Sequence, residues 1–187
     1  MRFGSFFAAG FAALAAAAAT PEQIVTGINV LTQKTSALQG PAQSITILNA
    51  PLIIIGQGPF PQIIAGYSDL VSTTNTLSAQ IGTGAERRAL EIREDGGAIV
   101  RDAFRTFVRV SQATLNILIG KAGLLEKVPL VGPPVAAVLR AYEASLDNLS
   151  IQLISTFASV SADLTNEANS LSATLELAIQ KYEGLQI

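Results

Sequence analysis

The stretch GAIVRDAFRTFVRVSQATLNILIGKAGLL, residues 97–125, repeats apolar residues every three or four positions and therefore predicts one long helix. Two adjacent apolar stripes run along it, one from Val100 to Leu118 and the other from Ile99 to Ile117. A helix that is apolar around so much of its circumference is expected to be packed by several neighbours. The stretch predicts the central helix of an all-α bundle.

Two helices are expected before this central one. The first runs from Thr20 to about Leu38, with Thr20 as N-cap, Pro21 at the first helical position and Gln23 completing a capping box. Gly40-Pro41 ends or kinks it, and a short continuation is expected from Ala42 to Leu48. The second helix begins near Phe60 and stops at Gly82, since its apolar stripe ends there. A strand over Ile45 to Ile55 is the alternative, but it would have no partner strand.

The chain after the central helix carries one apolar stripe from Val135 to Tyr182 without Gly or Pro. As a single helix of about 50 residues it would be roughly 75 Å long, too long for a compact domain to bury. We therefore expect a fold-back within Ser155 to Asp163, with Gly184 as the final cap. The predicted fold is an all-α bundle of about five amphipathic helices with no sheet.

The N-terminus is typical of a secretory signal. Arg2 precedes a nearly uninterrupted apolar run, and Ala17 and Ala19 give the small-x-small pattern that a signal peptidase accepts. The alternative, a membrane anchor, needs roughly 20 apolar residues, and this run is slightly short and ends at Thr20-Pro21. The sequence predicts a signal peptide over 1–19, a single helical domain over 20–187, secretion, and no transmembrane segment in the mature chain.

The composition leaves little for catalysis. The chain has no histidine and no cysteine, which excludes a Ser-His-Asp triad, a cysteine nucleophile, a tetrahedral zinc site and any disulfide. A formal net charge of −2 does not suggest nucleic acid. A Ser–Lys pair remains allowed, but no spacing favours it. We therefore predict a non-enzymatic protein with no catalytic residues, no metal and no cofactor.

Helices rich in Ala, Ser and Thr among Leu and Ile can pack imperfectly and leave an elongated apolar cavity, which suits an acyl chain. Apolar lining is predicted from the inward stripes: Ile28, Leu31, Ile63, Tyr67, Phe104, Phe107, Leu115, Leu139, Tyr142 and Leu146. Candidates for holding a polar head group are Thr35, Ser36 and Ser68. Each of these hydroxyls, taken alone, is more typical of a residue that caps a helix or faces water.

Three further features belong to the surface. The run Leu52, Ile53, Ile54, Ile55 lies between Pro51 and Gly56 and is expected to pack as a lid over the bundle end or to bind something. Asn148-Leu149-Ser150 is an N-glycosylation sequon in which Asn148 is exposed if Leu149 is buried. Arg87-Arg88 is a candidate dibasic processing site, although a polar loop is the more ordinary interpretation.

The central stretch also resembles a known family. Ala113-Thr114-Leu115, then Leu118, then Lys121 with an apolar pair after it are similar to the central helix of the fungal hydrophobic-surface-binding protein A family, which includes cell-wall galactomannoproteins. The "L…S…L" register that follows in that family is matched by Val138-Leu139, Ala144-Ser145-Leu146 and Leu149. The resemblance spans roughly residues 20–187.

This resemblance implies a secreted or wall-associated helical protein that is not an enzyme. Members adsorb to hydrophobic surfaces, can recruit lytic esterases to them, and in the mannoprotein branch enclose fatty acids. The leading hypothesis is therefore a protein that binds hydrophobic surfaces or lipids, with a secreted esterase or a cell-wall polysaccharide as further candidate partners. The alternative is a structural, O-glycosylated cell-wall mannoprotein without a specific ligand.

Overall fold

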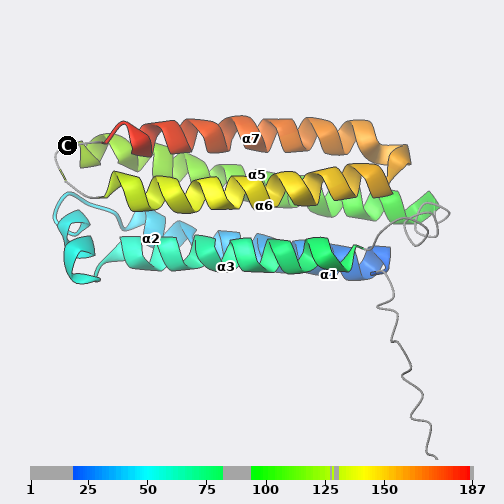
Figure 1. The fold of residues 1–187 in the computed structure, drawn as a ribbon, viewed down its shortest axis with the longest axis horizontal. Coiled ribbons are helices and arrows are strands. Elements are labelled where there is room, and N and C mark those ends of the chain that lie inside the picture. Colours follow the sequence, from blue (N-terminus) through cyan, green and yellow to red (C-terminus); the bar gives the residue numbers. More distant parts are fainter. Residues whose placement is uncertain (1–18, 82–93, 127, 129–130, 186–187) are drawn as a thin grey trace, which may run out of the picture.

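The computed structural model describes residues 19–81, 94–126, 128 and 131–185 and folds them into an elongated helical bundle (Figure 1). Its long helices are α1 (Pro21–Ala37), α3 (Pro59–Gln80), α5 (Glu94–Ala122), α6 (Gly132–Thr156) and α7 (Ser161–Glu183). Short elements are α2 (Gln39–Gln43) and the 3-10 turns η1 (Ala50–Ile55), η2 (Gly123–Leu125) and η3 (Ala158–Val160). No strand occurs in this part of the chain, and the predicted fold class is confirmed.

The long helices form a closed ring. Each packs against two neighbours, in the order α1, α5, α7, α6, α3 and back to α1. The chain colours in Figure 1 show that α1, α5 and α7 run in one direction and that α3 and α6 run in the other. Because every helix has one apolar stripe, the ring directs five stripes into a common interior.

Helix α5 has several neighbours, as predicted, since it contacts α1, α2 and α7 as well as η2 and η3. Its first stripe is buried throughout, including Val100, Phe104 and Leu118. The second stripe is not: Ile99 is 41% exposed and Ala113 also faces solvent. A helix in a ring is covered on its inner face and both flanks only, so neighbouring helices bury the first stripe completely and the second only in part.

The start of α1 confirms the predicted capping box. The Gln23 backbone N–H donates to Thr20 Oγ1 at 3.3 Å, and the Thr20 N–H donates to Gln23 Oε1 at 2.8 Å. One residue earlier, the Ala19 N–H donates to the Gln80 carbonyl at 2.8 Å, which fastens the start of α1 to the end of α3. Two donors that a helix start leaves without partners are thereby satisfied.

The fold-back between α6 and α7 lies where the sequence predicts it. Helix α6 ends at Thr156, Phe157 leaves the helical conformation with φ −114° and ψ 70°, and α7 begins at Ser161. Phe157 is only 2% exposed, so the reversal is fastened to the core. The two helices then run antiparallel, and Arg140 Nε donates to Glu183 Oε1 at 2.7 Å near the other end of the pair.

The connection between α2 and α3 differs from the expectation. Helix α2 ends at Gln43 and not near Leu48, and η1 replaces the strand considered for Ile45 to Ile55. The side chain of Asn49 accepts from the Thr46 N–H at 2.8 Å and donates to the Ser44 carbonyl at 2.7 Å, which closes a turn instead of extending the helix. Gly56 ends η1 in the left-handed region, with φ 71°.

Several predictions fall outside the described residues, namely those for the signal sequence over 1–18 and for Arg87-Arg88. Within the described ranges, no helix combines the length and the apolar character that crossing a membrane requires.

Close approach of α6 to α7 generates a stability prediction. A Cβ on Gly132 would collide with the backbone carbonyl oxygen of Tyr182, whereas a Cβ on Gly120 would meet nothing within 4 Å. Gly132→Ala should therefore destabilise the fold by about 1–3 kcal/mol, because backbone cannot move aside as a flexible side chain does. Gly120→Ala, the matched control, should stabilise it by about 0.5–1 kcal/mol. Urea unfolding followed by circular dichroism measures both, and equal stability of the two variants would contradict the packing.

Candidate functional site

The predicted apolar lining lies inside the ring. Nine of the ten side chains are at most 1% exposed and Leu146 is 4% exposed, and all belong to one continuous core: Ile28, Leu31, Ile63, Tyr67, Phe104, Phe107, Leu115, Leu139, Tyr142 and Leu146. Helix α7 adds Leu164, Leu171, Leu175, Ala178 and Ile179 to the same core. The α7 residues were missing from the predicted lining, although the stripe that identifies them was visible in the sequence.

Four hydroxyl-bearing side chains enter this apolar interior from four different helices. They are Thr35 of α1, Tyr67 of α3, Ser111 of α5 and Tyr142 of α6, each at most 1% exposed. The rings of Tyr67 and Tyr142 pack with centroids 5.2 Å apart at an interplanar angle of 59°. We call these four residues the hydroxyl cluster.

The hydroxyls of Tyr67, Ser111 and Tyr142 make no hydrogen bond of normal length and angle to the described residues, although Ser111 and Thr35 lie close enough to the Tyr142 hydroxyl to lower its pKa by hydrogen bonding. Thr35 differs, since its Oγ1 donates to the Leu31 carbonyl at 2.8 Å. A buried polar group left without a partner costs about 1–3 kcal/mol. Thr74, Ser78 and Thr156 have buried hydroxyls without a partner among the described residues too, so the cluster differs from them in bringing three such hydroxyls together from different helices, where a guest's polar group could bind.

Burial in this interior raises the pKa of the tyrosines, because the charged phenolate is less stable away from water. Burial raises the pKa of Tyr142 to about 12, although the neighbouring hydroxyls of Ser111 and Thr35 act in the opposite direction. Burial also raises the pKa of Tyr67 well above its usual value, and the nearby phenols of Tyr142 and Tyr182 add to that rise. The interior therefore disfavours an anion.

Of the three predicted head-group residues, the structure brings only Thr35 into the interior. Ser36 and Ser68 are exposed on the outside of the ring, and Ser68 Oγ donates to the Ile64 carbonyl at 2.9 Å. Each follows an inward residue by one position, which turns a side chain about 100° around a helix. The tyrosines, predicted as apolar lining, bring polar atoms into the interior instead.

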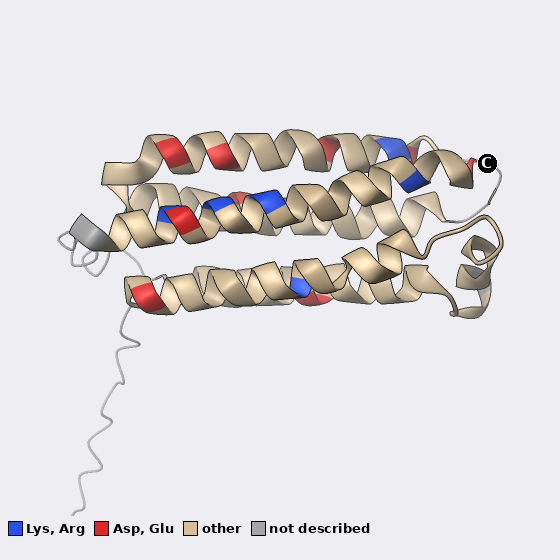
Figure 2. Ribbon diagram, turned by 180° about the vertical axis from the view of Figure 1, so that it is seen from behind, with Lys and Arg blue, Asp and Glu red and all other residues tan. Residues whose placement is uncertain are grey.

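Charged side chains lie outside this core. None of the Lys, Arg, Asp and Glu residues whose burial the structure describes is in the buried class, and Figure 2 shows where they occur along the helices. Many pair between neighbours, as Lys34 does with Asp69 at 2.7 Å and Arg105 with Glu167 at 2.7 Å. In the described ranges no group of three or more acidic side chains could hold a metal ion.

A second candidate surface lies at one end of the bundle, beyond α2 and around η1 (Figure 1). Four apolar side chains are exposed there, Ile47 at 59%, Leu48 at 91%, Leu52 at 37% and Ile55 at 65%. We call these four residues the apolar tip. The expectation of an inward-packed lid is wrong for Leu52 and Ile55, whereas Ile53 does pack against the core. The side chain of Ile54 lies outside the described residues.

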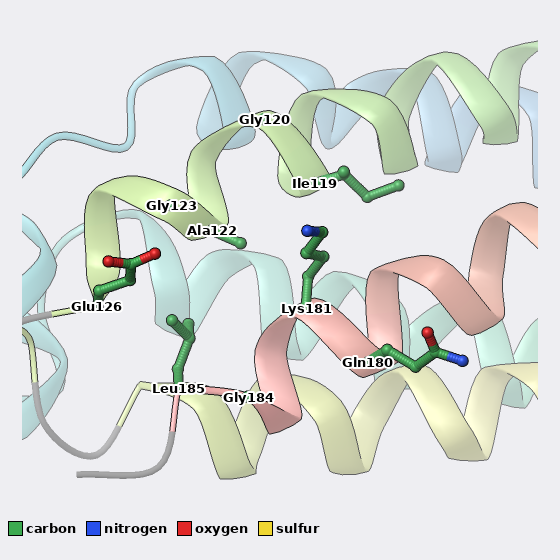
Figure 3. Close-up of a pocket in the computed structure, with 9 residues that line it drawn as sticks. All are labelled: Ile119, Gly120, Ala122, Gly123, Glu126, Gln180, Lys181, Gly184 and Leu185. Atoms are coloured by element: carbon green, nitrogen blue, oxygen red, sulfur yellow. The ribbon is translucent and has the colours of Figure 1, made fainter.

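A surface pocket of about 480 Å³ lies where α5 and α7 end (Figure 3). The Lys181 side chain reaches into it from α7, and Glu126 lies at its far side. Gly120 and Gly123 have no side chains, and a Cβ on either would meet nothing within 4 Å, so this part of the pocket is open. The lining is mixed, since the apolar side chains of Ile119, Ala122 and Leu185 lie beside the polar ones of Glu126, Gln180 and Lys181.

The sequon residue Asn148 is exposed and the next residue, Leu149, is fully buried, as the stripe predicts. Gln152 Nε2 donates to Asn148 Oδ1 at 3.3 Å along the outer face of α6. Glycosylation of Asn148 stays a prediction.

The difference between paired and orphaned phenols generates a second prediction. Tyr142→Phe removes a hydroxyl without a partner, so it should leave stability unchanged or raise it slightly. Tyr182→Phe removes the hydroxyl that donates to the Leu118 carbonyl at 3.1 Å, so it should cost about 1 kcal/mol. Denaturant unfolding of both variants tests this. A larger loss for Tyr142→Phe than for Tyr182→Phe would show that the Tyr142 hydroxyl has a partner in solution.

Comparison with known proteins identifies the fold. No protein-family model matches the sequence, and no curated protein sequence matches it significantly. The fold is similar to that in a crystal structure of AFMP4P in complex with palmitic acid, with a TM-score of 0.64 and 15% sequence identity. The match covers 87% of this chain and 99% of AFMP4P. The two chains therefore share their arrangement of helices.

Proposed function

We propose that this protein is a non-enzymatic lipid-binding protein that encloses a fatty-acid-like ligand inside its helical ring. The observation that carries the proposal is the hydroxyl cluster, in which three hydroxyls that make no hydrogen bond of normal geometry come together in a largely apolar core. The fold shared with AFMP4P, which was crystallised with palmitic acid, supports the same class of ligand. The acyl chain would contact the apolar lining and its head group the hydroxyls.

Apolar burial supplies the driving force. Each enclosed CH₂ group contributes about 0.8 kcal/mol, so a chain of about 16 carbons has ample free energy for submicromolar binding. Part of that free energy must separate helices, because the described core is filled by side chains. The contact between α1 and α3 is the least extensive of the five in the ring, which makes that seam the expected place of opening.

The resemblance to the hydrophobic-surface-binding protein A family extends this proposal. Family membership, secretion and a location outside the cell or in the cell wall are proposed on that resemblance and on the signal-like N-terminus. Recruitment of a secreted esterase, or contact with cell-wall polysaccharide, is proposed on the resemblance alone. A structural wall protein without a ligand is the competing function, and it differs by binding no lipid.

Palmitic acid uptake tests the main proposal. Secreted protein purified without detergent should gain the mass of one palmitic acid in native mass spectrometry, lose it on delipidation and regain it on reloading. Leu115→Asn places a polar group on the inner face of α5 and should abolish the gain. Ile99→Asn makes the same change on the exposed side of α5 and should not.

Circular dichroism establishes that both variants are folded before they are compared. If Leu115→Asn does not fold, Phe107→Leu, which keeps the interior apolar but changes its shape, replaces it and should weaken uptake. Wild-type protein that never acquires the added mass would overturn the proposal and favour the structural alternative.

Adsorption to hydrophobic surfaces is a second candidate function, and the apolar tip is the observation that favours it. Residues 35–68, which contain the tip, include no charged residue. This segment brings four exposed Ile and Leu side chains to an apolar surface without a charge of its own, and the neighbouring charge is Lys121, whose Nζ donates to the Ile45 carbonyl at 2.9 Å. Among the other exposed large apolar side chains, Val30, Ile99, Ile151 and Leu177 lie on the long helices, whereas Leu124 lies in η2 after α5.

The double variant Leu48→Ser/Ile55→Ser should reduce retention on octyl-coated beads severalfold, because it removes the most exposed part of the tip. Ile151→Ser/Leu177→Ser is the matched control, with two exposed apolar side chains removed elsewhere. Stability should change by less than about 0.5 kcal/mol per site in both, since all four positions are on the surface. Equal loss of retention in the two double variants would show that adsorption does not depend on the tip.

A further inference from the structure

The interior of the ring offers a ligand hydroxyl groups but no charge. The charged side chains whose burial the structure describes lie outside the buried class, whereas the buried polar residues are Ser and Thr together with the three tyrosines. An ionised carboxylate enclosed there would have no countercharge. Burying such an ion costs several kcal/mol even after relaxation of the protein.

The partial charges at helix ends do not offset the cost of burying an ionised carboxylate near the hydroxyl cluster. Tyr67, Ser111 and Tyr142 lie within the bodies of α3, α5 and α6, away from the helix N-termini that bind anions. Thr35 lies in the last turn of α1, where the partial charge of the backbone is negative. The helix end to which Thr35 belongs therefore disfavours an anion.

The raised pKa of the buried tyrosines also indicates that this interior disfavours an anion. The surroundings raise the pKa of Tyr142 and of Tyr67 by excluding water from the phenolate. A guest carboxylic acid placed beside them would experience the same desolvation, which raises the pKa of any buried acid.

We propose that the hydroxyl cluster selects lipids whose head group is uncharged when bound, either a long-chain alcohol or a fatty acid in its protonated form. This inference rests on the proposed lipid-binding function. An alcohol or a protonated carboxyl both donates and accepts hydrogen bonds, and so do the hydroxyls of Tyr67, Ser111 and Tyr142. The match satisfies orphaned atoms on both sides without burying a charge.

No other titratable group near the cluster carries the expected pH dependence. On the neighbouring helices the charged side chains are exposed or partly exposed, as follows: Lys34 of α1, Asp69 of α3, Arg109 of α5, Arg140, Glu143 and Asp147 of α6, and Glu176 and Lys181 of α7. Burial, Asp147 and Glu176 raise the pKa of Glu143, but that carboxyl belongs to the outer groove between α6 and α7. The ligand's own carboxyl is therefore the group expected to titrate.

Calorimetric titration of the delipidated protein with dodecanoic acid and 1-dodecanol between pH 5.5 and 8.5 tests the inference. If only the protonated acid binds, its apparent Kd should rise about tenfold per pH unit above the carboxyl's ordinary pKa of about 4–5. The Kd of 1-dodecanol should stay constant over the same range.

A variant assigns the effect to the hydroxyl cluster. Tyr142→Phe should weaken 1-dodecanol binding roughly three- to tenfold, which is the worth of one hydrogen bond, and leave dodecane binding unchanged. Tyr182→Phe is the matched control, since its hydroxyl already donates to Leu118, and it should bind both as the wild type does.

Two results would overturn the inference while leaving lipid binding intact. One is an affinity for dodecanoic acid that does not change with pH. The other is equal weakening of 1-dodecanol and dodecane by Tyr142→Phe, which would give that side chain a role in shape alone. Failure of all three lipids to bind at any pH would instead overturn the proposed function itself.

Discussion

Exclusion of charge from the space inside five helices is the constraint on which the rest of this structure depends. The chain has no cysteine, so no disulfide can stabilise it and cohesion must come from burying apolar stripes. Only 14% of residues are charged, and those whose burial the structure describes stay outside the core, where pairs such as Arg105 with Glu167 join neighbouring helices. What remains inside is apolar or carries a hydroxyl, and this restricts which molecules the interior can receive.

Much of this architecture is predictable from the sequence, because its causes are local. The capping box at Thr20 and the stripes of α5 and α7 depend on residues within a few positions of each other. The need for a fold-back follows from length, since an uninterrupted helix could not be buried, and the Ser/Thr-rich stretch Ser155 to Asp163 indicated its place. The connection around Asn49 was predicted less well. The Asn49 side chain hydrogen-bonds the backbone of Thr46 and Ser44 and so closes a turn, and such local bonds compete with the backbone hydrogen bonds of a helix or strand.

The candidate site was predictable only in part, for a different physical reason. Periodicity tells which face of a helix is buried, and so the apolar lining was assigned to the interior correctly. It does not tell which buried hydroxyl finds a partner, since the Tyr182 and Tyr142 phenols differ only in the neighbours that tertiary packing gives them. Ser36 and Ser68 failed as head-group candidates because one position along a helix separates inside from outside.

The interior site and the apolar tip are connected by the chain itself. The uncharged segment 35–68 begins at Thr35, passes through the whole tip and ends one residue after Tyr67, so two members of the hydroxyl cluster flank the tip in sequence. The same segment joins α1 to α3, the two helices whose mutual contact is the least extensive in the ring. Under the proposed function, displacement of the tip by an apolar surface would act on the seam between α1 and α3, where the ring is expected to open for a lipid. One uncharged connection would then serve both proposed activities, adsorption and enclosure.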